Sequence, residues 1–296
     1  MKKVSSRKKI ERKSDFRSRF LVGSVCILIL ALLLPNAFNP ILANFIALIF
    51  AALCAMALWE FLVLCEKKQM HPPKAWIITG SILYVLSTFL SMNLSNLAYA
   101  PMLVLSLTIF LIFILHFKNP KNSLNQLGTS IFGLIYIAVP IGFMIHILYQ
   151  PYILQDGRLW LLYLIILTKG NDIAAYYVGR FFGKRKLASH LSPKKTWLGS
   201  FAGIVAALIF SILFYVWLKK PHFWHIQLNL VEAIVLGLLI PIVGQIGDLA
   251  ESLIKRDVGT KDSSFLPGLG GVLDILDALL FTAPMLYFYL RFQNIL

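Results

Sequence analysis

Five acidic side chains interrupt otherwise apolar segments in the second half of the chain: Asp172, Asp248, Glu251, Asp274 and Asp277. A charge at membrane depth costs at least ~2.5 kcal/mol on insertion scales, so such residues usually line a water-filled or partnered site. On a helix, residues 248 and 251 share one face, as do residues 274 and 277. Carboxylate oxygens grouped in this way are typical ligands of Mg²⁺.

Salt bridges are the simpler interpretation of these charges. Lys169 comes three residues before Asp172, and Lys255 comes four residues after Glu251, so each pair could form within one helix. A salt bridge explains either pair alone as well as a metal does. It explains the whole set less well, because the carboxylates cluster at one membrane depth beside segments that suit phosphate.

The first of these segments is GRFFGKRKLASHLSPKKTWLGS, which begins at Gly179. It is rich in basic residues and contains a short polar run made of Ser192, Lys194, Lys195 and Thr196 around one proline. Ammonium and hydroxyl groups in such a run can hold anions. We therefore predict that this loop contacts a phosphate group.

The second segment, GTKDSSFLPGLGG, follows the basic pair Lys255 and Arg256 and contains Lys261. Its glycines lead directly into the last apolar segment. Glycines before a helix let a phosphate approach the free backbone N–H groups of the first turn. Together with the acids that follow, this turn predicts a site for a polyphosphate and its metal. The glycines concerned are Gly268, Gly270 and Gly271.

The chain that must position these residues has the composition of a membrane protein. Of its 296 residues, 58% are hydrophobic and only 14% are charged, against roughly 25% charged in soluble domains. Nine apolar runs approach the ~20 residues that cross a bilayer as a helix. We predict an all-α integral membrane protein with about nine transmembrane helices. The predicted spans are 20–34, 41–65, 75–92, 98–117, 128–150, 159–180, 197–218, 230–250 and 272–290.

The positions of Lys and Arg predict the orientation, because basic loops stay in the cytoplasm. With the N-terminus inside, 23 of the 28 basic residues fall on the cytoplasmic side and 4 outside. We expect a basic cytoplasmic arm (1–19), N-terminal transmembrane helices (20–150) and a C-terminal catalytic region (151–296) with cytoplasmic loops 180–196 and 251–271. The first run is interpreted as a span, not a cleaved signal peptide. Anionic membrane lipids, not nucleic acid, are the expected partner of the arm.

The first half of the chain offers little chemistry of its own. Its spans contain almost no ionisable groups, and Glu60 sits near a cytoplasmic end, where we expect its carboxylate to reach the water. The cysteines, Cys26, Cys54 and Cys65, have no metal-binding spacing and are interpreted as small packing residues.

The second half resembles the phosphatidate cytidylyltransferase, or CDP-diacylglycerol synthase, family. SLIKRDVGTKDSSFLPGLGGVLDILD matches that family's S-x-x-K-R-x(4)-K-D, P-G-H-G-G and D-R-x-D motifs in order. NDIAAYYVGRFFGKRKL, LSPKKTW and QIGDLAES match its upstream segments. Three positions depart from the pattern: Leu198 replaces Glu, Leu269 replaces His and Ile275 replaces Arg. The resemblance covers about 105 residues, from Asp172 to Asp277.

The resemblance implies a reaction in phospholipid biosynthesis, CTP plus phosphatidic acid giving CDP-diacylglycerol and pyrophosphate. It implies a multi-pass protein of the cell (inner) membrane whose site faces the cytoplasm. Both a monomer and a homodimer are compatible with the sequence. An alternative is a CTP-dependent polyprenol-type lipid kinase, which would release CDP. A secondary transporter is disfavoured, because its charges would lie near the midplane in both halves.

Spacing and resemblance together suggest roles for the polar and glycine residues of the motifs. The metal ligands are expected to hold one or two cations, Mg²⁺ above all: Asp248, Asp274 and Asp277, with Asp172 and Glu251 beside them. The catalytic set is Asp248, Asp274, Asp277, Lys255 and Lys261. The substrate-binding set is Ser192, Lys194, Lys195, Thr196, Ser252, Arg256, Asp262, Gly268, Gly270 and Gly271.

Overall fold

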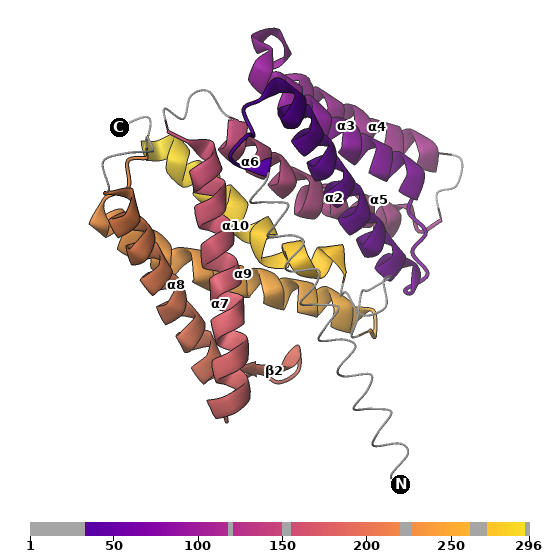
Figure 1. Cartoon of the computed structure of the whole chain (residues 1–296). Helices are drawn as coiled ribbons and strands as arrows, with labels where there is room; N and C mark the ends of the chain where they lie inside the picture. Colours follow the sequence, from indigo (N-terminus) through magenta and orange to yellow (C-terminus); the bar gives the residue numbers. More distant parts are fainter. Residues whose placement is uncertain (1–32, 118–120, 150–154, 220–225, 261–270, 294–296) are drawn as a thin grey trace, which may run out of the picture.

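The computed structural model describes residues 33–117, 121–149, 155–219, 226–260 and 271–293 (Figure 1). Within these ranges the chain is helical except for one short β-hairpin and the connecting turns. The predicted loop residues Lys261, Asp262, Gly268 and Gly270 lie outside them, as does nearly all of the predicted span 20–34. The elements are α2 (Pro40–Glu66), α3 (Lys74–Asn93), η1 (Ser95–Leu97), α4 (Ala100–His116), α5 (Ser123–Gly133), the π-helical η2 (Leu134–Ala138), α6 (Val139–Tyr149), α7 (Gly157–Phe182), β1 (Lys186–Ala188), β2 (Ser192–Thr196), α8 (Trp197–Leu218), α9 (Leu230–Asp257) and α10 (Val272–Gln293).

Seven of the described helical segments are long and apolar enough to cross a membrane. They correspond to seven of the nine predicted spans, and they make the protein an all-α, multi-pass membrane protein. The eighth, α7, has 26 residues and would be ~39 Å long at 1.5 Å per residue. α7 is long enough to cross a membrane but less apolar than these seven, because it contains Arg158, Lys169, Asp172 and Arg180. The seven are 40–66, 74–93, 95–116, 123–149, 197–218, 230–257 and 272–293.

α9 is longer than the predicted span 230–250. It continues for two more turns to Asp257, so the first part of the predicted loop 251–271 is helix. Gly259, with φ of +70°, ends it in a Schellman motif: its N–H donates to Arg256 O (3.0 Å), and Thr260 N donates to Lys255 O (2.9 Å). In the sequence, Gly259 marks the end of this helix, whereas the apolar run ends several residues earlier. The helix therefore carries its last charged turns beyond the apolar segment.

The predicted loop 180–196 also contains regular structure. After α7 ends at Phe182, β1 and β2 pair antiparallel, with Lys186 opposite Thr196 and Ala188 opposite Ser192. The SPKKT run is therefore strand β2. The register shifts between these two pairs, so the strand is irregular: Lys194 is exposed, Lys195 is half-buried and Thr196 is buried.

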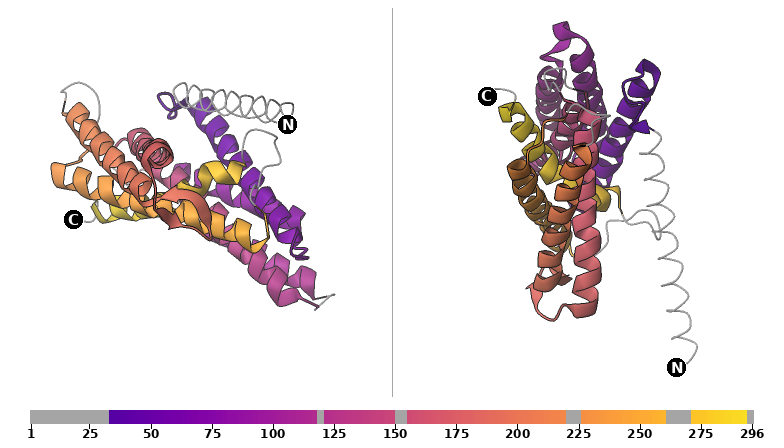
Figure 2. Two further views of the ribbon diagram at one scale, coloured as in Figure 1. Left: turned by 90° about the horizontal axis from the view of Figure 1, so that it is seen from below. Right: turned by 60° about the vertical axis from the view of Figure 1, so that its left-hand side comes forward.

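α10 connects the two halves of the molecule. α2 to α6 form one group of helices, and α7, α8 and α9 form another, with α10 running between them (Figures 1 and 2). α10 packs against α9 on one side and against α6 and α2 on the other. The N-terminal helices thus contact the helix that carries Asp274 and Asp277.

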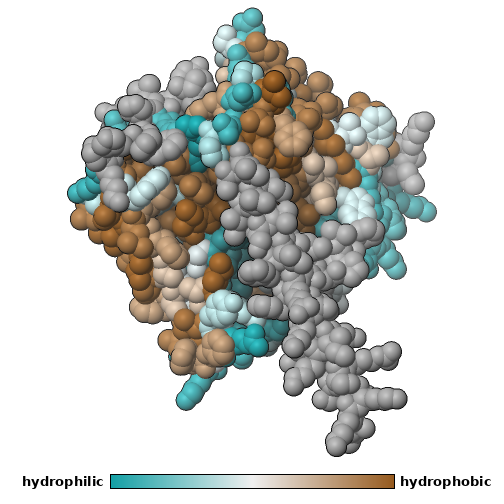
Figure 3. Space-filling model, in the orientation of Figure 1, coloured by the Kyte–Doolittle hydropathy of each residue, from teal (hydrophilic) through white to brown (hydrophobic). Residues whose placement is uncertain are grey.

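Apolar side chains cover the broad middle of the face shown in Figure 3, and polar residues gather toward its ends. α4 is the extreme case, since Met102, Leu107 and Phe110 are each more than half exposed. Side chains of this kind are stable on a surface that lipid covers. The distribution agrees with helices that lie in a bilayer.

Candidate active site

The five predicted acids lie on three helices that contact one another, α7, α9 and α10. Asp172 lies on α7, Asp248 and Glu251 lie on α9, and Asp274 and Asp277 lie in the first turns of α10. Asp248 is close enough to Asp172, Glu251 and Asp277 for Coulomb repulsion with each of them. Helices that are separate in sequence therefore bring their charges to one polar region, which we call the acidic site.

Lys255 joins two of these helices. It is 8% exposed, and its Nζ lies 2.8 Å from Glu251 Oε1 on its own helix. The same ammonium group also contacts Asp274 Oδ1 on α10. The local salt bridge expected for Glu251 is thus present, but it belongs to a three-residue cluster between two helices. Lys255 neutralises two carboxylates that would otherwise repel each other.

Two further lysines pair with the acids Asp248 and Asp172. Lys195 on β2 places its Nζ 2.8 Å from Asp248 Oδ2 on α9. Lys169 on α7 lies 3.5 Å from Asp172 Oδ2 and donates to Ile275 O at the start of α10, at 2.8 Å. Both lysines therefore link elements, and Lys169, which we expected only as a salt-bridge partner of Asp172, also connects α7 to α10.

A buried polar network holds Asp172 in position. Asn171 Nδ2 donates to Asp172 Oδ1 at 3.1 Å, and Gln245 Nε2 on α9 donates to Asn171 Oδ1 at 2.8 Å. Ser200 on α8 hydrogen-bonds to Gln245. α8 can approach this network because residue 203 is glycine: a Cβ there would lie 2.4 Å from Asn171 Oδ1. The contact explains how α8, which carries no acid, helps to fix the site.

Residues of the SPKKT strand differ in what they contact: one reaches the acidic site and another caps α8. Lys195 points to the acidic site, whereas Thr196 is 3% exposed and its hydroxyl accepts from Gly199 N at 3.2 Å as the N-cap of α8. Lys194 is exposed and Ser192 is half-buried. A substrate role stays a prediction for Ser192, Lys194 and Thr196, and the Thr196 hydroxyl also caps α8.

Replacing Thr196 with Val should therefore lower stability more than it changes substrate binding. Loss of a threonine cap costs about 1 kcal/mol, and the N–H of Gly199 would lose its acceptor. We expect a lower melting temperature, an unchanged KM for CTP, and near-normal behaviour for Thr196→Ser. A KM that rises several-fold at normal stability would assign the hydroxyl to the substrate.

Arg256 is partly used by the fold. Its Nε donates to Leu191 O at 2.9 Å, which ties the β-hairpin to the end of α9, and Nη1 lies 3.5 Å from Thr260 O. Ser252 is half-buried beside the acidic face. Phosphate binding by Arg256 stays a prediction, since it would have to act from this anchored position.

The N-terminus of α10 differs from the predicted phosphate cradle. The N–H of Gly271 donates to Asp274 Oδ2 at 3.1 Å, and the next two N–H groups, of Val272 and Leu273, donate to Glu60 at 2.9 Å each. The protein's own carboxylates thus accept from these three donors. Any cradle would have to come from the preceding turn, which lies outside the described residues.

Glu60 is the functional candidate that the sequence analysis misinterpreted. We expected its carboxylate to reach the water, but the residue is 6% exposed and bonds to α10. Tyr136 on η2 was also missed: its ring packs against Phe61 and Phe281, and its buried hydroxyl has no hydrogen-bond partner among the described residues. Tyr136 lies in the π-helical segment η2, and such segments often mark functional sites, but they are seen in the structure and not in the sequence.

The donor set suits a hard divalent cation. The acidic site has five carboxylates and three lysines among the described residues, so it carries excess negative charge. Glu251 is 4% exposed, and the partner of its Oε1 among the described residues is the Lys255 ammonium at 2.8 Å. Within the described ranges, no three of these side chains gather around one point as ligands. The oxygens fit Mg²⁺ chemically, and binding it would draw carboxylates closer together.

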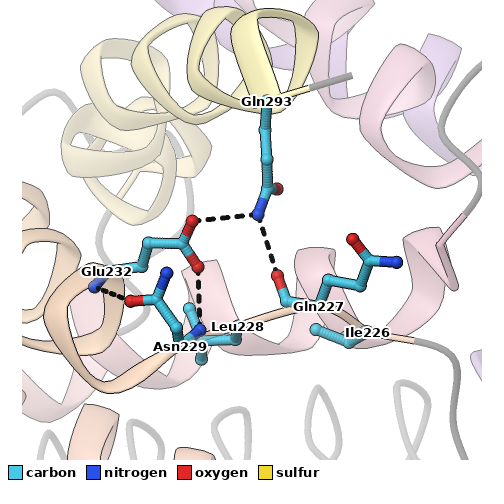
Figure 4. Close-up of a pocket in the computed structure, with 6 residues that line it drawn as sticks. All are labelled: Ile226, Gln227, Leu228, Asn229, Glu232 and Gln293. Atoms are coloured by element: carbon cyan, nitrogen blue, oxygen red, sulfur yellow. Dashed lines mark hydrogen bonds between the residues drawn. The ribbon is translucent and has the colours of Figure 1, made fainter. Parts of the chain in front are cut away.

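The opposite end of α9 and α10 is polar for a different reason. Figure 4 shows a small hollow there in which Gln293 donates to Glu232 (3.1 Å) and to Gln227 O (2.9 Å). Asn229 and Glu232 form the capping box that starts α9. These bonds tie the helix ends together and leave few free polar groups. The hollow is therefore part of the scaffold, a full helix length from the acidic site.

Comparison with known proteins decides the family. The model of the cytidylyltransferase family matches residues 17–293. The chain belongs to this family. It is 31% identical over 287 residues to a phosphatidate cytidylyltransferase of Chlamydia pneumoniae, covering 93% of this chain and 92% of that protein. It is 30% identical over 283 residues to the one of Bacillus subtilis, covering 93% and 98%. One from Brucella suis is 44% identical over 134 residues, covering 45% and 47%.

Two of the three departures from the family motifs can be placed. Leu198 and Ile275 are both exposed, at 46% and 39%, and the backbone oxygen of Ile275 accepts from Lys169. Leu269 lies outside the described residues. None of the three replacements removes one of the five acids.

Proposed function

We propose that the protein is a phosphatidate cytidylyltransferase, which joins CTP and phosphatidic acid into CDP-diacylglycerol and pyrophosphate. The observation that carries the proposal is the acidic site, in which five carboxylates and three lysines from α7, β2, α9 and α10 lie close together and form ion pairs between these elements. Family membership and the names of the relatives support the same reaction.

The lipid phosphate is the nucleophile. As a phosphomonoester with a second pKa of about 6 it is largely dianionic near neutral pH, so it can attack the CTP α-phosphorus without a general base. Pyrophosphate then leaves. The main obstacle is repulsion between the two anions, which positive groups must reduce. The acidic site can do so only if it also binds cations.

Asp248, Asp274 and Asp277 would hold Mg²⁺, with Asp172 and Glu251 beside them. When bound, the metal would neutralise the CTP phosphates and hold them for in-line attack. Lys195 and Lys255 pair with these acids. A substrate phosphate could replace the carboxylate as the partner of each ammonium group. These lysine ammonium groups would then bind the triphosphate or the leaving pyrophosphate.

The site also lies where both substrates can arrive. Asp274 and Asp277 lie in the first turns of α10, and Asp248 and Glu251 lie in the last third of α9, so phosphatidic acid can enter from the bilayer and CTP from water. We infer a cytoplasmic site in the cell (inner) membrane, with about nine spans and the N-terminus inside. The support is the 23-to-4 division of Lys and Arg, together with the ion pair of Lys68 with Asp257, which joins the turn after α2 to the end of α9, two segments predicted on the same side.

The inferred orientation predicts the result of cysteine labelling. In a background without the three native cysteines, His190→Cys should react only with a reagent that reaches the cytoplasmic side. Asn96→Cys, in the exposed turn between α3 and α4, should react only from outside. The reverse pattern would place the acidic site away from cytoplasmic CTP.

The activity itself is tested with purified protein, CTP, phosphatidic acid and Mg²⁺. We expect CDP-diacylglycerol and pyrophosphate in equal amounts, and loss of both with EDTA. Release of CDP with a phosphorylated lipid would mark a kinase. Folded protein that gives no lipid product under varied lipid conditions would disprove the proposal.

A further inference from the structure

Glu60 connects the N-terminal helices to the acidic site by two hydrogen bonds. It lies on α2, more than 200 residues before its partners, and is 6% exposed. Its Oε1 accepts from Val272 N and its Oε2 accepts from Leu273 N, both at 2.9 Å. These are the first two residues of α10. One carboxylate from another helix therefore caps the helix that carries two of the candidate metal ligands.

A carboxylate is well suited to this position. The first N–H groups of a helix have no acceptor within it, and the positive end of the helix dipole attracts an anion. Such ends also bind phosphates in many proteins. With Glu60 in place, the protein fills this position itself, so the substrate phosphates are left to the metal and the lysines.

The cap also fixes where α10 begins. Asp274 and Asp277 follow Leu273 by one and four residues, so their directions depend on the start and rotation of this first turn. Asp274 accepts from Gly271 N in the same turn, which ties the acidic site to the capped backbone. A shift of the first turn would move both carboxylates together.

The contact between α2 and α10 does not depend on this carboxylate alone. Phe61, next to Glu60, packs on Tyr136 with ring centroids 6.5 Å apart, and Tyr136 packs on Phe281 of α10 at 6.2 Å. Lys68 and Asp257 add an ion pair near the ends of α2 and α9. The helices therefore have other contacts to keep them together when Glu60 loses its charge.

We propose that Glu60 is a positioning residue of the acidic site, which holds the start of α10 so that Asp274 and Asp277 can bind the metal and which keeps phosphate away from that helix end. This inference rests on the proposed function for its enzymatic part. Its structural part, the cap, is independent of the reaction.

Glu60→Gln tests the proposal, with Glu66→Gln as a matched control. Glu66 lies on the same helix but is exposed and paired with Lys74 at 2.6 Å. Gln has the size of Glu but only one acceptor oxygen, so one of the two N–H groups loses its partner. In protein without nucleotide, hydrogen–deuterium exchange at residues 272 and 273 should be faster in Glu60→Gln and unchanged in Glu66→Gln.

The enzymatic readout is the Mg²⁺ requirement. Loss of a group that orients metal ligands typically costs about 10- to 100-fold in affinity or activity. For Glu60→Gln we expect the Mg²⁺ concentration at half-maximal rate to rise within that range, with most of kcat regained at saturating metal. Glu60→Ala, which removes both acceptors, should show a larger change in both readouts; if it does not fold, Glu60→Gln alone decides.

The outcomes separate the two proposals. Wild-type exchange together with a wild-type Mg²⁺ requirement in folded Glu60→Gln would overturn this inference. So would a fall in melting temperature with no change in the Mg²⁺ requirement, because Glu60 would then serve the fold only. If the wild-type protein makes no CDP-diacylglycerol, the proposed function fails, and the exchange experiment still decides whether Glu60 caps α10.

Discussion

Asp277→Asn should lower turnover by about 100-fold or more while leaving the protein folded. The residue is 8% exposed, and its Oδ1 accepts from Ala278 N at 2.7 Å, a bond that the amide oxygen of Asn can keep. The change therefore removes a charge but little of the packing. If Asp277 binds the metal, part of several kcal/mol of phosphate charge stabilisation is lost, and each 1.4 kcal/mol is a factor of ten in rate.

The control for this experiment is Asp257→Asn. Asp257 lies on α9 near the same end of the molecule, but its side chain is 62% exposed and it pairs with Lys68 at the surface. Exposed pairs contribute at most about 1 kcal/mol, so activity should stay within a few-fold of wild type. The measurement is the steady-state rate of CDP-diacylglycerol synthesis at saturating CTP, with melting temperature recorded for each variant. Near-normal turnover of folded Asp277→Asn would remove Asp277 from the catalytic set.

The sequence predicted what depends on local helix geometry. Asp248, Glu251 and Lys255 share one face of α9 as their spacing requires, and the Glu251–Lys255 ion pair follows from the i, i+4 rule. The end of α9 was the exception. The apolar run stops near residue 250, and we predicted the end of the span from it. The backbone stays helical until Gly259 provides a left-handed residue.

Contacts between distant segments could not be predicted in the same way. Lys195 contacts Asp248 across 53 positions, because the hairpin lies against α9, to which Arg256 also ties it. Glu60 meets Val272 across 212 positions. An acid near the end of a span can either extend to water or cap a neighbouring helix, and only the packing of α2 against α10 decides between them. No spacing rule contains that information.

Lys255→Met should destabilise the protein by about 3–5 kcal/mol, the usual effect of breaking a buried pair. Glu251 and Asp274 would be left near each other without the ammonium that now contacts both, and Met keeps most of the side-chain volume. Unfolding in mixed micelles, with EDTA present so that metal does not compensate, measures this loss. Lys68→Met, at an exposed pair, should change stability by no more than about 1 kcal/mol.

A double variant separates the structural part of Lys255 from its catalytic part. Adding Glu251→Gln to Lys255→Met removes one of the two repelling charges, so much of the lost stability should return. Activity should not return with it, because no ammonium group remains to bind the triphosphate. The double variant should therefore approach Glu251→Gln in stability but be at least 10-fold less active, the cost of about 1.4 kcal/mol in the transition state. Equal activities of these two variants would mean that Lys255 only neutralises carboxylates, and phosphate binding would then fall to Lys195 and the basic residues of the loop after α9.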